Sequence, residues 1–363
     1  MKICYLADSN SIHTQKWVKY FVEKGYKISL ISFSPHKIEG TKSYFIKLPF
    51  PKSISPVGSN FLKLQYFLSI FKIRKIVNKI KPDILHSHWA TSYGIVGSFI
   101  NYHPFIVSVW GSDIYEFPYK SIIHKWLIKR VLKSADRICS TSIVMSKEIA
   151  KFTNKKIFVT PFGVDVEKFK PPKQESNKKY FTIGTIKSLE EKYGLEYLIR
   201  AFAILKKQLN DKKIKLEIYG KGSQEEYLKK LSYDLGLSNV IGFKGYISHD
   251  LVPEKFQCFD IAVFPSISDS ESFGVAAIEA QACGVPVVVS NVGGLPEVVN
   301  NGKTGFVVPP KDSYIIAKKI LYLYENKNIR KKMGNTARKF VIENYVWENN
   351  AKIMSDKYLE LLK

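Results

Sequence analysis

Apolar positions in the first half of the chain recur in two ways: short runs typical of buried strands, and longer stretches with helical spacing. Residues 3–7 predict a strand, residues 14–24 an amphipathic helix that ends at Gly25, and residues 27–33 the next strand. The alternation continues with strands at 82–89, 105–109, 137–140 and 156–160, and with helices at 92–100, 120–133 and 142–152. Strands that alternate with helices predict an α/β domain.

The second half repeats this pattern after a break rich in proline and charge. The break consists of Pro161-Phe-Gly-Val-Asp165 and the polar residues 170–179, a composition typical of a linker. Strands are predicted at 180–186, 215–219, 240–244, 261–264 and 286–290, helices at 194–209, 224–235, 313–325, 329–342 and 348–362, and a short hairpin-like segment at 301–309. Since 363 residues suffice for two cores, we expect two domains, residues 1–165 and 166–345.

One stretch of the second half combines two glutamates with a helix start. Glu271 and Glu279 stand eight residues apart, on either side of the turn Ser272-Phe273-Gly274. The turn follows one predicted strand and opens the helix before the next, so it lies at the carboxyl end of a strand, where open α/β sheets bind ligands. The free N–H groups of Phe273, Gly274 and Val275 would face an anion there. We expect a phosphorylated sugar donor, with Glu271 near the sugar and Glu279 near a ribose.

Two further loops of the second half lie at strand ends. Lys187 and Lys192 follow the first strand, where two cations would neutralise a diphosphate leaving group. Gly220-Lys-Gly222 follows another strand and would line a base or phosphate pocket, although a G-x-G alone is weak evidence. Lysine is common throughout this chain, so only their position in the loop distinguishes Lys187 and Lys192 from the other lysines.

The first strand of the chain is followed by Asp8-Ser-Asn-Ser-Ile-His13-Thr14. This loop is not the G-x-G-x-x-G turn of a dinucleotide-binding domain, so we do not expect the first domain to bind NAD. His13 and Thr14 lie near a helix start and could contact a substrate. The alternative is that Ser11 or Thr14 only caps the helix.

Two other strand ends of the first half carry polar side chains. His86 and His88 share one face of the strand at residues 82–89, where they could hold a phosphate, an acceptor hydroxyl or a metal. The loop Trp110-Gly-Ser-Asp113 follows the next strand. The structural alternatives are a hydrogen-bonded core histidine for the pair, and a helix cap or turn residue for Asp113.

Composition indicates a globular protein of the cytoplasm. Hydrophobic residues make up 45% and charged residues 24%, no apolar run reaches the roughly 18 residues of a transmembrane helix, and the start does not resemble a signal peptide. The four cysteines are scattered and have no histidines at zinc spacing, so we expect buried thiols and no metal or other cofactor.

The net charge of +24 favours an anionic partner: a phosphorylated substrate, an acidic membrane surface or a nucleic acid. Residues 40–82 contain no Asp or Glu, and residues 60–80 predict a basic amphipathic helix of the kind that lies on anionic lipid. A generally lysine-rich composition explains the same residues, and both explanations stay open. The chain has no RNA-binding or helix-turn-helix signature, so a nucleic-acid partner is not expected.

Several ordered motifs extend over the chain and are dense in its second half. They are Pro161-Phe-Gly-Val-Asp165, Tyr219-Gly-Lys-Gly222, Phe264-Pro-Ser266, the pair Glu271 and Glu279 around Phe273-Gly274, Ala280-Gln-Ala-Cys-Gly-Val-Pro286, Gly293-Gly-Leu-Pro-Glu297 and Thr304-Gly305. Together they resemble the retaining glycosyltransferases of family 4. This resemblance implies the GT-B fold: two facing Rossmann-like, doubly wound domains with a cleft between them, and a final helix (residues 346–363) that packs back on the first domain.

The resemblance also implies transfer of a sugar from a nucleotide diphosphate sugar, with retention and without a required metal. Glu271 would contact the hydroxyls of the donor sugar, Glu279 the ribose, the amides at Phe273 to Val275 the phosphates, and Lys192 the diphosphate. The acceptor would bind the first domain.

This chain departs from the family pattern at several places, and one of them is that Lys192 is followed by Tyr193-Gly194 rather than directly by glycine. Lys187, in Gly184-Thr-Ile-Lys187, stands where many members have an arginine, and Trp110 stands where many have a histidine that contacts the sugar. The opening loop lacks the paired glycines common in the family. Asp113 or His88 would take over part of the role of that histidine.

We therefore expect a cytoplasmic hexosyltransferase, peripheral on the inner face of the membrane. It would move a hexose or N-acetylhexosamine from a UDP-sugar to a glycan or lipid-linked acceptor in surface polysaccharide synthesis. Two rivals are a GT-B fold epimerase of a UDP-sugar and, from the charge alone, a non-catalytic nucleic-acid-binding protein.

Overall fold

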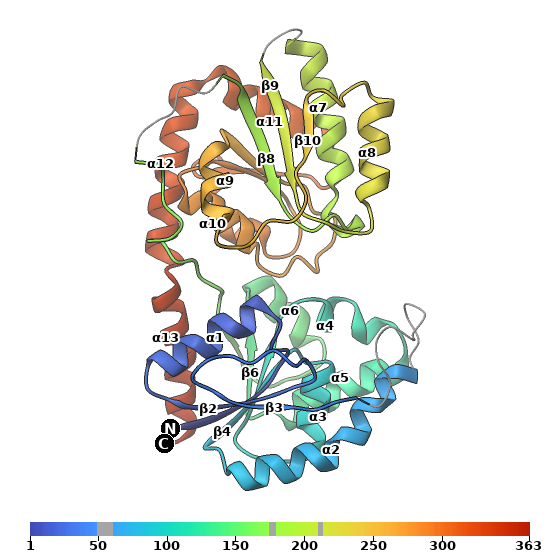
Figure 1. The fold of residues 1–363 in the computed structure, drawn as a ribbon, viewed down its shortest axis with the longest axis vertical. Coiled ribbons are helices and arrows are strands. Elements are labelled where there is room, and N and C mark those ends of the chain that lie inside the picture. Colours follow the sequence, from blue (N-terminus) through green and yellow to red (C-terminus); the bar gives the residue numbers. More distant parts are fainter. Residues whose placement is uncertain (49–60, 174–178, 210–212) are drawn as a thin grey trace. The chain divides into compact units, whose positions relative to one another are not determined.

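The computed structural model describes residues 1–48, 61–173, 179–209 and 213–363. The chain divides into two compact units (Figure 1). Unit 1 comprises Met1–Thr160 and Ala351–Lys363, and unit 2 comprises Pro161–Asn350. The division lies close to the boundary predicted at Asp165. Residues 49–60 of the basic stretch and 174–178 of the predicted linker lie outside the described residues.

Unit 1 is built on one parallel sheet. Its strands are β1 (Lys2–Leu6), β2 (Lys27–Ser32), β3 (Lys42–Phe45), β4 (Ile84–His88), β5 (Phe105–Val109), β6 (Arg137–Ser140) and β7 (Ile157–Val159), in the order β3-β2-β1-β4-β5-β6-β7. Its helices are α1 (Ile12–Glu23), α2 (Phe61–Ile80), α3 (Ser92–Ile100), α4 (Ser112–Tyr115), the 3-10 turn η2 (Phe117–Tyr119), α5 (Ile122–Ser134) and α6 (Ile143–Ala150). The last helix, α13 (Trp347–Leu361), begins in unit 2 and enters unit 1 at Ala351.

Unit 2 repeats the same layering around a second parallel sheet. Its strands are β8 (Phe181–Ile186), β9 (Ile214–Tyr219), β10 (Ile241–Phe243), β11 (Ile261–Phe264), β12 (Val287–Ser290) and β13 (Gly305–Val308), in the order β10-β9-β8-β11-β12-β13. Its helices are η3 (Glu191–Tyr193), α7 (Leu195–Leu209), α8 (Glu225–Asp234), α9 (Val252–Cys258), α10 (Val275–Ala282), η4 (Leu295–Val298), α11 (Ser313–Glu325) and α12 (Lys327–Asn344). The α/β fold class predicted for both halves is confirmed.

Each strand order reverses direction at one place. In unit 1 the chain adds strands outward from β1 on one side and from β4 on the other, and in unit 2 it does so from β8 and β11. The loops that leave two such neighbouring strands run to opposite faces of the sheet and open a crevice at its carboxyl edge. The loops after β1, β4, β8 and β11 are therefore the first places to look for a ligand.

One prediction of local structure is wrong, and some elements were not predicted. The hairpin-like segment at residues 301–309 is wrong, because β13 pairs in parallel with β12 in the register Val288 to Phe306. Strand β3 and helix α9 were not predicted. The side chains of β3 are half-buried or exposed, and α9 is only seven residues long with Pro253 in its first turn.

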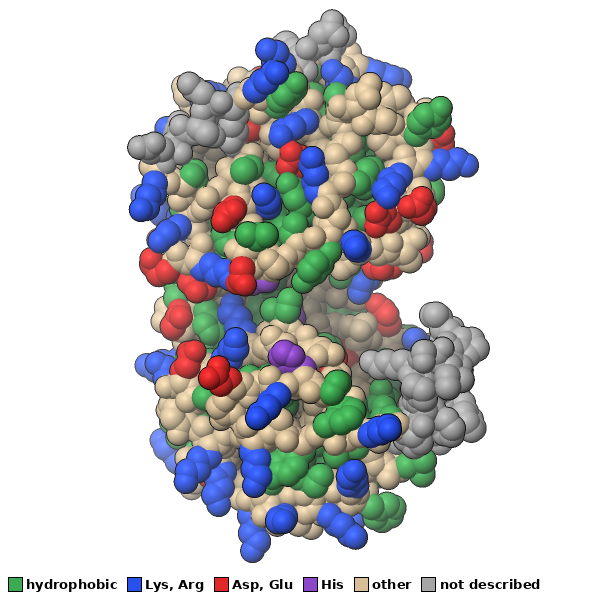
Figure 2. Space-filling view, viewed as in Figure 1, with side chains coloured by type: hydrophobic (Ala, Val, Ile, Leu, Met, Phe, Trp, Pro, Cys, Tyr) green, Lys and Arg blue, Asp and Glu red, His purple; other side chains and the backbone are tan. Residues whose placement is uncertain are grey.

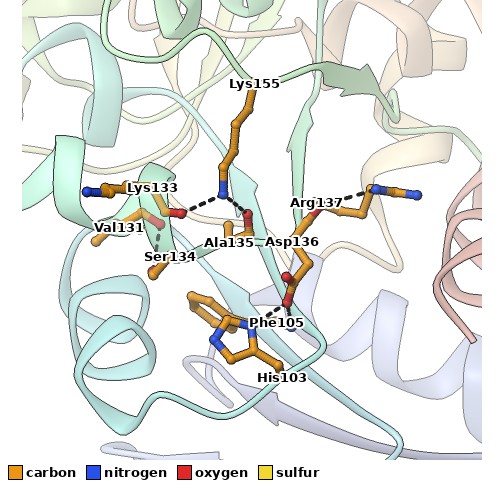
Figure 3. A network of polar contacts seen from close by, with 9 residues as sticks. All are labelled: His103, Phe105, Val131, Lys133, Ser134, Ala135, Asp136, Arg137 and Lys155. Carbon is orange, nitrogen blue, oxygen red and sulfur yellow. Dashed lines mark hydrogen bonds and ion pairs between the residues drawn. The ribbon is translucent and has the colours of Figure 1, made fainter.

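The opposite, amino edge of the unit 1 sheet is closed by a polar network (Figure 3). A carboxylate oxygen of Asp136 accepts hydrogen bonds from the Phe105 amide at 2.7 Å and from the His103 ring at 2.6 Å. The Lys155 ammonium donates to the carbonyls of Lys133 and Ala135, at the end of α5. These carbonyls have no partner within a helix, so the network fixes the turn from α5 into β6 and serves the fold.

Charge is spread over the surface: Figure 2 shows Lys and Arg side chains scattered among other types over the visible face of each unit. The predicted basic helix exists as α2, which buries Ile70, Ile73 and Val77 and exposes Leu68 and Phe71. Among the described residues, no helix is both long enough and apolar enough to cross a membrane.

Candidate functional site

The loop after β8 brings a lysine to the two predicted glutamates. The Lys187 ammonium lies 2.7 Å from a carboxylate oxygen of Glu271, and the side chains are 18% and 10% exposed. Ser266 donates to the same oxygen at 3.4 Å. Burial lowers the pKa of Lys187, but the carboxylates of Glu271 and Glu279 outweigh it and hold the pKa above its ordinary value. A cation and two carboxylates therefore meet at the reversal point of the unit 2 sheet.

Tyr193 connects the two predicted lysines. The ammonium of Lys187 lies 4.5 Å from the centre of the Tyr193 ring, and that of Lys192 lies 5.2 Å from it. The backbone of this loop is fixed against the loop after β11, because the Ile267 amide donates to the Lys192 carbonyl at 2.9 Å. Gly194 has a φ of +58°, and a Cβ there would lie 2.3 Å from the carbonyl of Pro265. The Tyr193 ring thus lies next to both ammonium groups, of which that of Lys187 contacts Glu271.

Glu279 has a partner that sequence analysis did not find. A carboxylate oxygen of Glu279 lies 2.8 Å from the Nε2 atom of His249, with side chains 10% and 37% exposed. His249 precedes α9, and its ring lies 5.4 Å from that of Phe169. Its contact with Glu279 spans 30 residues of sequence, and no motif marks it. A half-exposed imidazole therefore stands beside the carboxylate expected to bind a ribose.

Helix α10 begins at the predicted turn. Gly274 precedes the helix with a φ of +99°, and a Cβ there would lie 2.8 Å from a methyl group of Leu295. The ring of Phe273 is buried and anchors the turn against Phe162 and Tyr345. The first amides of a helix have no carbonyl partner within it, and the N–H groups predicted to face an anion, at Phe273, Gly274 and Val275, lie at this start of α10.

Two glycine motifs act on this site through the backbone. A Cβ on Gly293 would lie 2.2 Å from the carbonyl of Glu271, and one on Gly294 would lie 2.4 Å from the carbonyl of Ser272. A Cβ on Gly220 would lie 1.9 Å from the carbonyl of Lys187. These close approaches explain why glycine occupies the three positions, and they place Gly220 behind Lys187 as a support.

In unit 1 the predicted residues His13, Thr14 and His88 also come together. The Thr14 hydroxyl lies 3.2 Å from the Nδ1 atom of His88, and the rings of His88 and Trp110 are 4.4 Å apart. The ring of His13 lies edge-on to Trp110 at 6.0 Å. Ser11 accepts a hydrogen bond from the Thr14 amide, so Ser11 is the helix cap. The loops after β1, β4 and β5 thus contribute to one cluster.

Behind this cluster lies a buried chain of hydrogen bonds. The Nδ1 atom of His86 lies 2.6 Å from the Tyr358 hydroxyl of α13, and its Nε2 atom lies 2.8 Å from the Ser108 hydroxyl. The hydroxyls of Tyr358 and Tyr5 are 2.8 Å apart. Burial lowers the pKa of His86 to about 3, and burial together with repulsion from His86 lowers the pKa of His88 well below its ordinary value. Both imidazoles are neutral at physiological pH.

Asp113 is buried, and its carboxylate accepts hydrogen bonds from backbone amides. Its carboxylate accepts hydrogen bonds from the amides of Ala90, Trp110 and Gly111, at 2.8, 3.1 and 2.7 Å. Burial raises the pKa of Asp113, although these amides oppose the rise. The contacts match the turn role that the sequence left open: Asp113 joins the loop after β4 to the loop after β5.

Within the described parts of the chain, no cluster of three or more His, Cys, Asp or Glu side chains is arranged to hold a metal ion. Cys4, Cys139 and Cys283 are buried free thiols, and Cys258 is exposed. The two groups of residues therefore offer different chemistry. Unit 2 holds a cation, two carboxylates and the start of a helix, which suit an anionic ligand with hydroxyl groups. Unit 1 holds buried, neutral imidazoles beside tryptophan.

Both halves of the chain match known families. Residues 166–340 match the model described as glycosyl transferases group 1, and residues 2–142 match the model described as glycosyl transferase 4-like. An uncharacterised glycosyltransferase of Methanocaldococcus jannaschii is 27% identical over 94% of this chain and 92% of its own. The capsular polysaccharide biosynthesis glycosyltransferase CapM of Staphylococcus aureus is 29% identical over 77% of this chain and 78% of its own.

The fold matches solved structures over the whole chain. The structure of HepE from Anabaena in complex with UDP superposes with a TM-score of 0.81, covers 99% of this chain and 100% of its own, and has 18% sequence identity. At this identity the similarity concerns the fold.

Proposed function

Because the chain belongs to the glycosyl transferases group 1 family, with the GT-B fold and nucleotide-sugar-dependent activity of that family, we propose that it is a retaining hexosyltransferase. It moves a hexose or N-acetylhexosamine from a UDP-sugar to a glycan or lipid-linked acceptor. The name of CapM supports a role in surface polysaccharide synthesis. The UDP in the HepE complex supports uracil as the base.

The observation that carries this proposal is the cluster of Lys187, Glu271 and Glu279 beside the start of α10. Glu271 accepts hydrogen bonds from hydroxyls of the donor sugar, and Glu279 accepts them from the ribose. The amides at Phe273 to Val275 and the ammonium of Lys192 bind the diphosphate. The carboxylates are suited to the hydroxyl groups of a nucleotide diphosphate sugar, and the amides and the ammonium are suited to its phosphates.

Catalysis follows from positioning and electrostatics. Negative charge develops on the diphosphate as the bond to the sugar breaks, and fixed cations and amides around it stabilise that charge in the transition state. The leaving phosphate then guides the incoming acceptor hydroxyl on the same face of the sugar, which gives retention without a dedicated base. Lys187 contributes as a cation whose raised pKa keeps it charged at physiological pH.

Unit 1 supplies the acceptor side. His13 is half-buried at the carboxyl edge of the sheet, next to the buried side chains of His88 and Thr14. Asp113 acts by holding the loops that carry His88 and Trp110. The neutral state of His88 allows it to accept or donate a hydrogen bond to a hydroxyl without adding charge.

The basic face of α2 supports a peripheral position on an anionic membrane. Flotation with liposomes tests this part separately. We expect more protein to be recovered with anionic than with neutral liposomes, and equal recovery would contradict it.

A nucleotide screen tests the donor site. A ligand that binds only the folded protein raises its melting temperature according to concentration and affinity. We expect UDP and UDP-sugars to raise it more than GDP and GDP-sugars. Glu279→Ala should reduce the UDP effect, because it removes the ribose contact, and Lys187→Met should reduce the effect of UDP-sugars.

The control is a second ion pair of the same unit. Lys215 and Glu217 lie 2.7 Å apart on strand β9, so Lys215→Met removes a comparable pair and should leave the UDP effect intact. Product analysis separates transfer from epimerisation, since transfer releases UDP and epimerisation releases an isomeric nucleotide sugar. No stabilisation by any nucleotide would contradict the donor proposal.

A further inference from the structure

A short turn between β10 and α9 carries the imidazole that contacts Glu279. The Leu251 amide donates to the Ser248 carbonyl at 3.0 Å, which closes the turn around His249 and Asp250. Helix α9 packs beside α10 within unit 2 (Figure 1). The turn before α9 therefore lies next to the helix that carries Glu279.

Both central residues of this turn are held by a segment at the start of unit 2. The Asp250 carboxylate lies 2.6 Å from the Lys168 ammonium, and the ring of His249 lies 5.4 Å from that of Phe169. Phe169 is buried, and Arg338 donates to its carbonyl at 2.5 Å. The imidazole is therefore packed against a fixed ring, while 37% of its side chain remains exposed.

The contact with Glu279 determines which ring nitrogen carries the proton. An ionised carboxylate only accepts hydrogen bonds, so Nε2 of His249 donates across 2.8 Å to Oε1 of Glu279. The Glu279 side chain is 10% exposed, and the last torsion of a glutamate side chain is otherwise broadly distributed. The hydrogen bond thus restricts the rotation of a nearly buried carboxylate, and it uses only one of the two carboxylate oxygens.

The two carboxylates of the site have different partners. Glu271 contacts the Lys187 ammonium at 2.7 Å, whereas Glu279 contacts His249. Burial lowers the pKa of Lys187 and Glu271 raises it, and Glu279 contributes least among the groups that raise it. His249 therefore gives Glu279 a position that does not depend on the ion pair of Lys187 with Glu271.

We propose that His249 is a positioning residue for the donor: it holds the Glu279 carboxylate so that Oε2 accepts hydrogen bonds from the 2′- and 3′-hydroxyls of the ribose. The inference rests on the proposed function, because it concerns the ribose contact assigned there to Glu279. His249 acts through Glu279 rather than by touching the nucleotide. A carboxylate that is already oriented loses less conformational freedom when the ribose binds, which raises the affinity.

Two ligands that differ only in the ribose hydroxyls test this role. UDP and 2′,3′-dideoxy-UDP are titrated into the full chain by calorimetry. Because hydrogen bonds to charged groups are strong, we expect the native chain to bind UDP about tenfold or more tightly than the dideoxy compound. Loss of positioning should weaken only the binding of UDP, whereas a purely structural role of His249 would change the two affinities alike.

Two substitutions separate the hydrogen bond of His249 from its packing. His249→Phe keeps a ring against Phe169 but has no N–H group, so it should weaken UDP binding about fivefold or more and change the binding of the dideoxy compound by less than about twofold. His249→Gln has an amide N–H group at about the reach of Nε2 and should stay within about threefold of the native chain for both ligands. The control is Asp250→Asn on the same turn, which removes an exposed ion pair and should leave both affinities unchanged.

A double variant shows whether His249 acts through Glu279. His249→Phe combined with Glu279→Ala should bind UDP no more weakly than Glu279→Ala alone, because the carboxylate that His249 positions is already absent. A further loss in the double variant would contradict the proposal and assign His249 a direct contact with the nucleotide. Thermal unfolding without ligand shows that each variant is folded, and His249→Ala replaces His249→Phe if the phenyl ring prevents folding.

The outcomes separate this inference from the donor assignment. If His249→Phe weakens both ligands equally, or keeps the native preference for UDP, the positioning role is overturned and the donor assignment stands. If the native chain binds UDP and the dideoxy compound equally well, the ribose contact of Glu279 fails and the role of His249 fails with it. If the native chain binds neither, the donor assignment itself fails.

Discussion

Mild acid should destabilise unit 1 through its buried histidines. His86 is 1% exposed and lies between the hydroxyls of Tyr358 and Ser108, and burial lowers its pKa to about 3. In the unfolded chain the pKa of histidine is about 6.5. Between these two pH values the histidine binds a proton in the unfolded state but not in the folded state. The free energy of unfolding therefore falls as the pH falls.

The size of the effect follows from that difference. Protonation of one histidine stabilises the unfolded chain by about 0.2 kcal/mol at pH 7 and by about 2 kcal/mol at pH 5. His86 should therefore lower the free energy of unfolding by about 2 kcal/mol over this interval. The pKa of His88 is also lowered by burial, so His88 adds a loss of the same sign. Because carboxylates titrate mainly below pH 5, the change in stability between pH 7 and pH 5 comes mainly from the histidines.

Urea unfolding followed by tryptophan fluorescence measures this loss. Of the five tryptophans, Trp17, Trp89, Trp110 and Trp126 lie in unit 1, so the signal reports mainly on that unit. His86→Gln can still hydrogen-bond but has no ring to titrate. The variant should be less stable at pH 7, and its loss between pH 7 and pH 5 should be about 2 kcal/mol smaller than that of the native chain.

His36→Gln is the matched control, because His36 is exposed in the same unit. It should leave the pH dependence unchanged. If the native chain and His86→Gln lose the same stability between pH 7 and pH 5, then His86 is not held neutral by burial, and the reasoning is refuted.

Three further predictions concern single contacts. Asp113→Ala should lower the free energy of unfolding by about 2–4 kcal/mol in urea, because it leaves buried amides without an acceptor; a loss below about 1 kcal/mol would contradict this. Gly293→Ala should reduce the thermal stabilisation by UDP, because its Cβ would displace the Glu271 carbonyl, whereas Gly302→Ala, also at positive φ but in open space, should not. Tyr358→Phe should cost about 1–3 kcal/mol in urea unfolding, since it removes buried hydrogen bonds from α13 to the sheet, and a native unfolding midpoint would count against that network.

The sequence predicts the parallel sheets well because their strands are buried on both faces. Strands such as β4 and β5 are buried throughout, and such runs stand out between amphipathic helices. Strand β3 lacks this signal, because none of its four side chains is buried. The segment at residues 301–309 contains turn residues that suggest a hairpin, but the partner of β13 is the earlier strand β12. Local patterns do not show which strand a segment will join.

The residues of the candidate site also differ in whether the sequence identifies them. Lys187 and Glu271 were identifiable because they lie in the loops that leave β8 and β11, and parallel strands bring such loops to one edge. Glu279 was identifiable because it lies in α10, the helix that follows the loop after β11. His249 was not identifiable, because it reaches Glu279 from a loop 30 residues away. Tyr358 reaches His86 across 272 residues. Such contacts arise only from tertiary packing, and neither residue spacing nor composition predicts them.

The net charge of +24 is a poor guide to where an anion binds. Most lysines are exposed and surrounded by water, which weakens their interaction with any one ligand. Lys187 differs because it is only 18% exposed, and its charge is retained through Glu271 and Glu279. These two carboxylates also repel a diphosphate, so Lys187 alone does not make the site attractive to one. Under the proposed function, affinity for the diphosphate would therefore depend on the amides of α10 and on Lys192, while the carboxylates would select a ligand that brings hydroxyl groups.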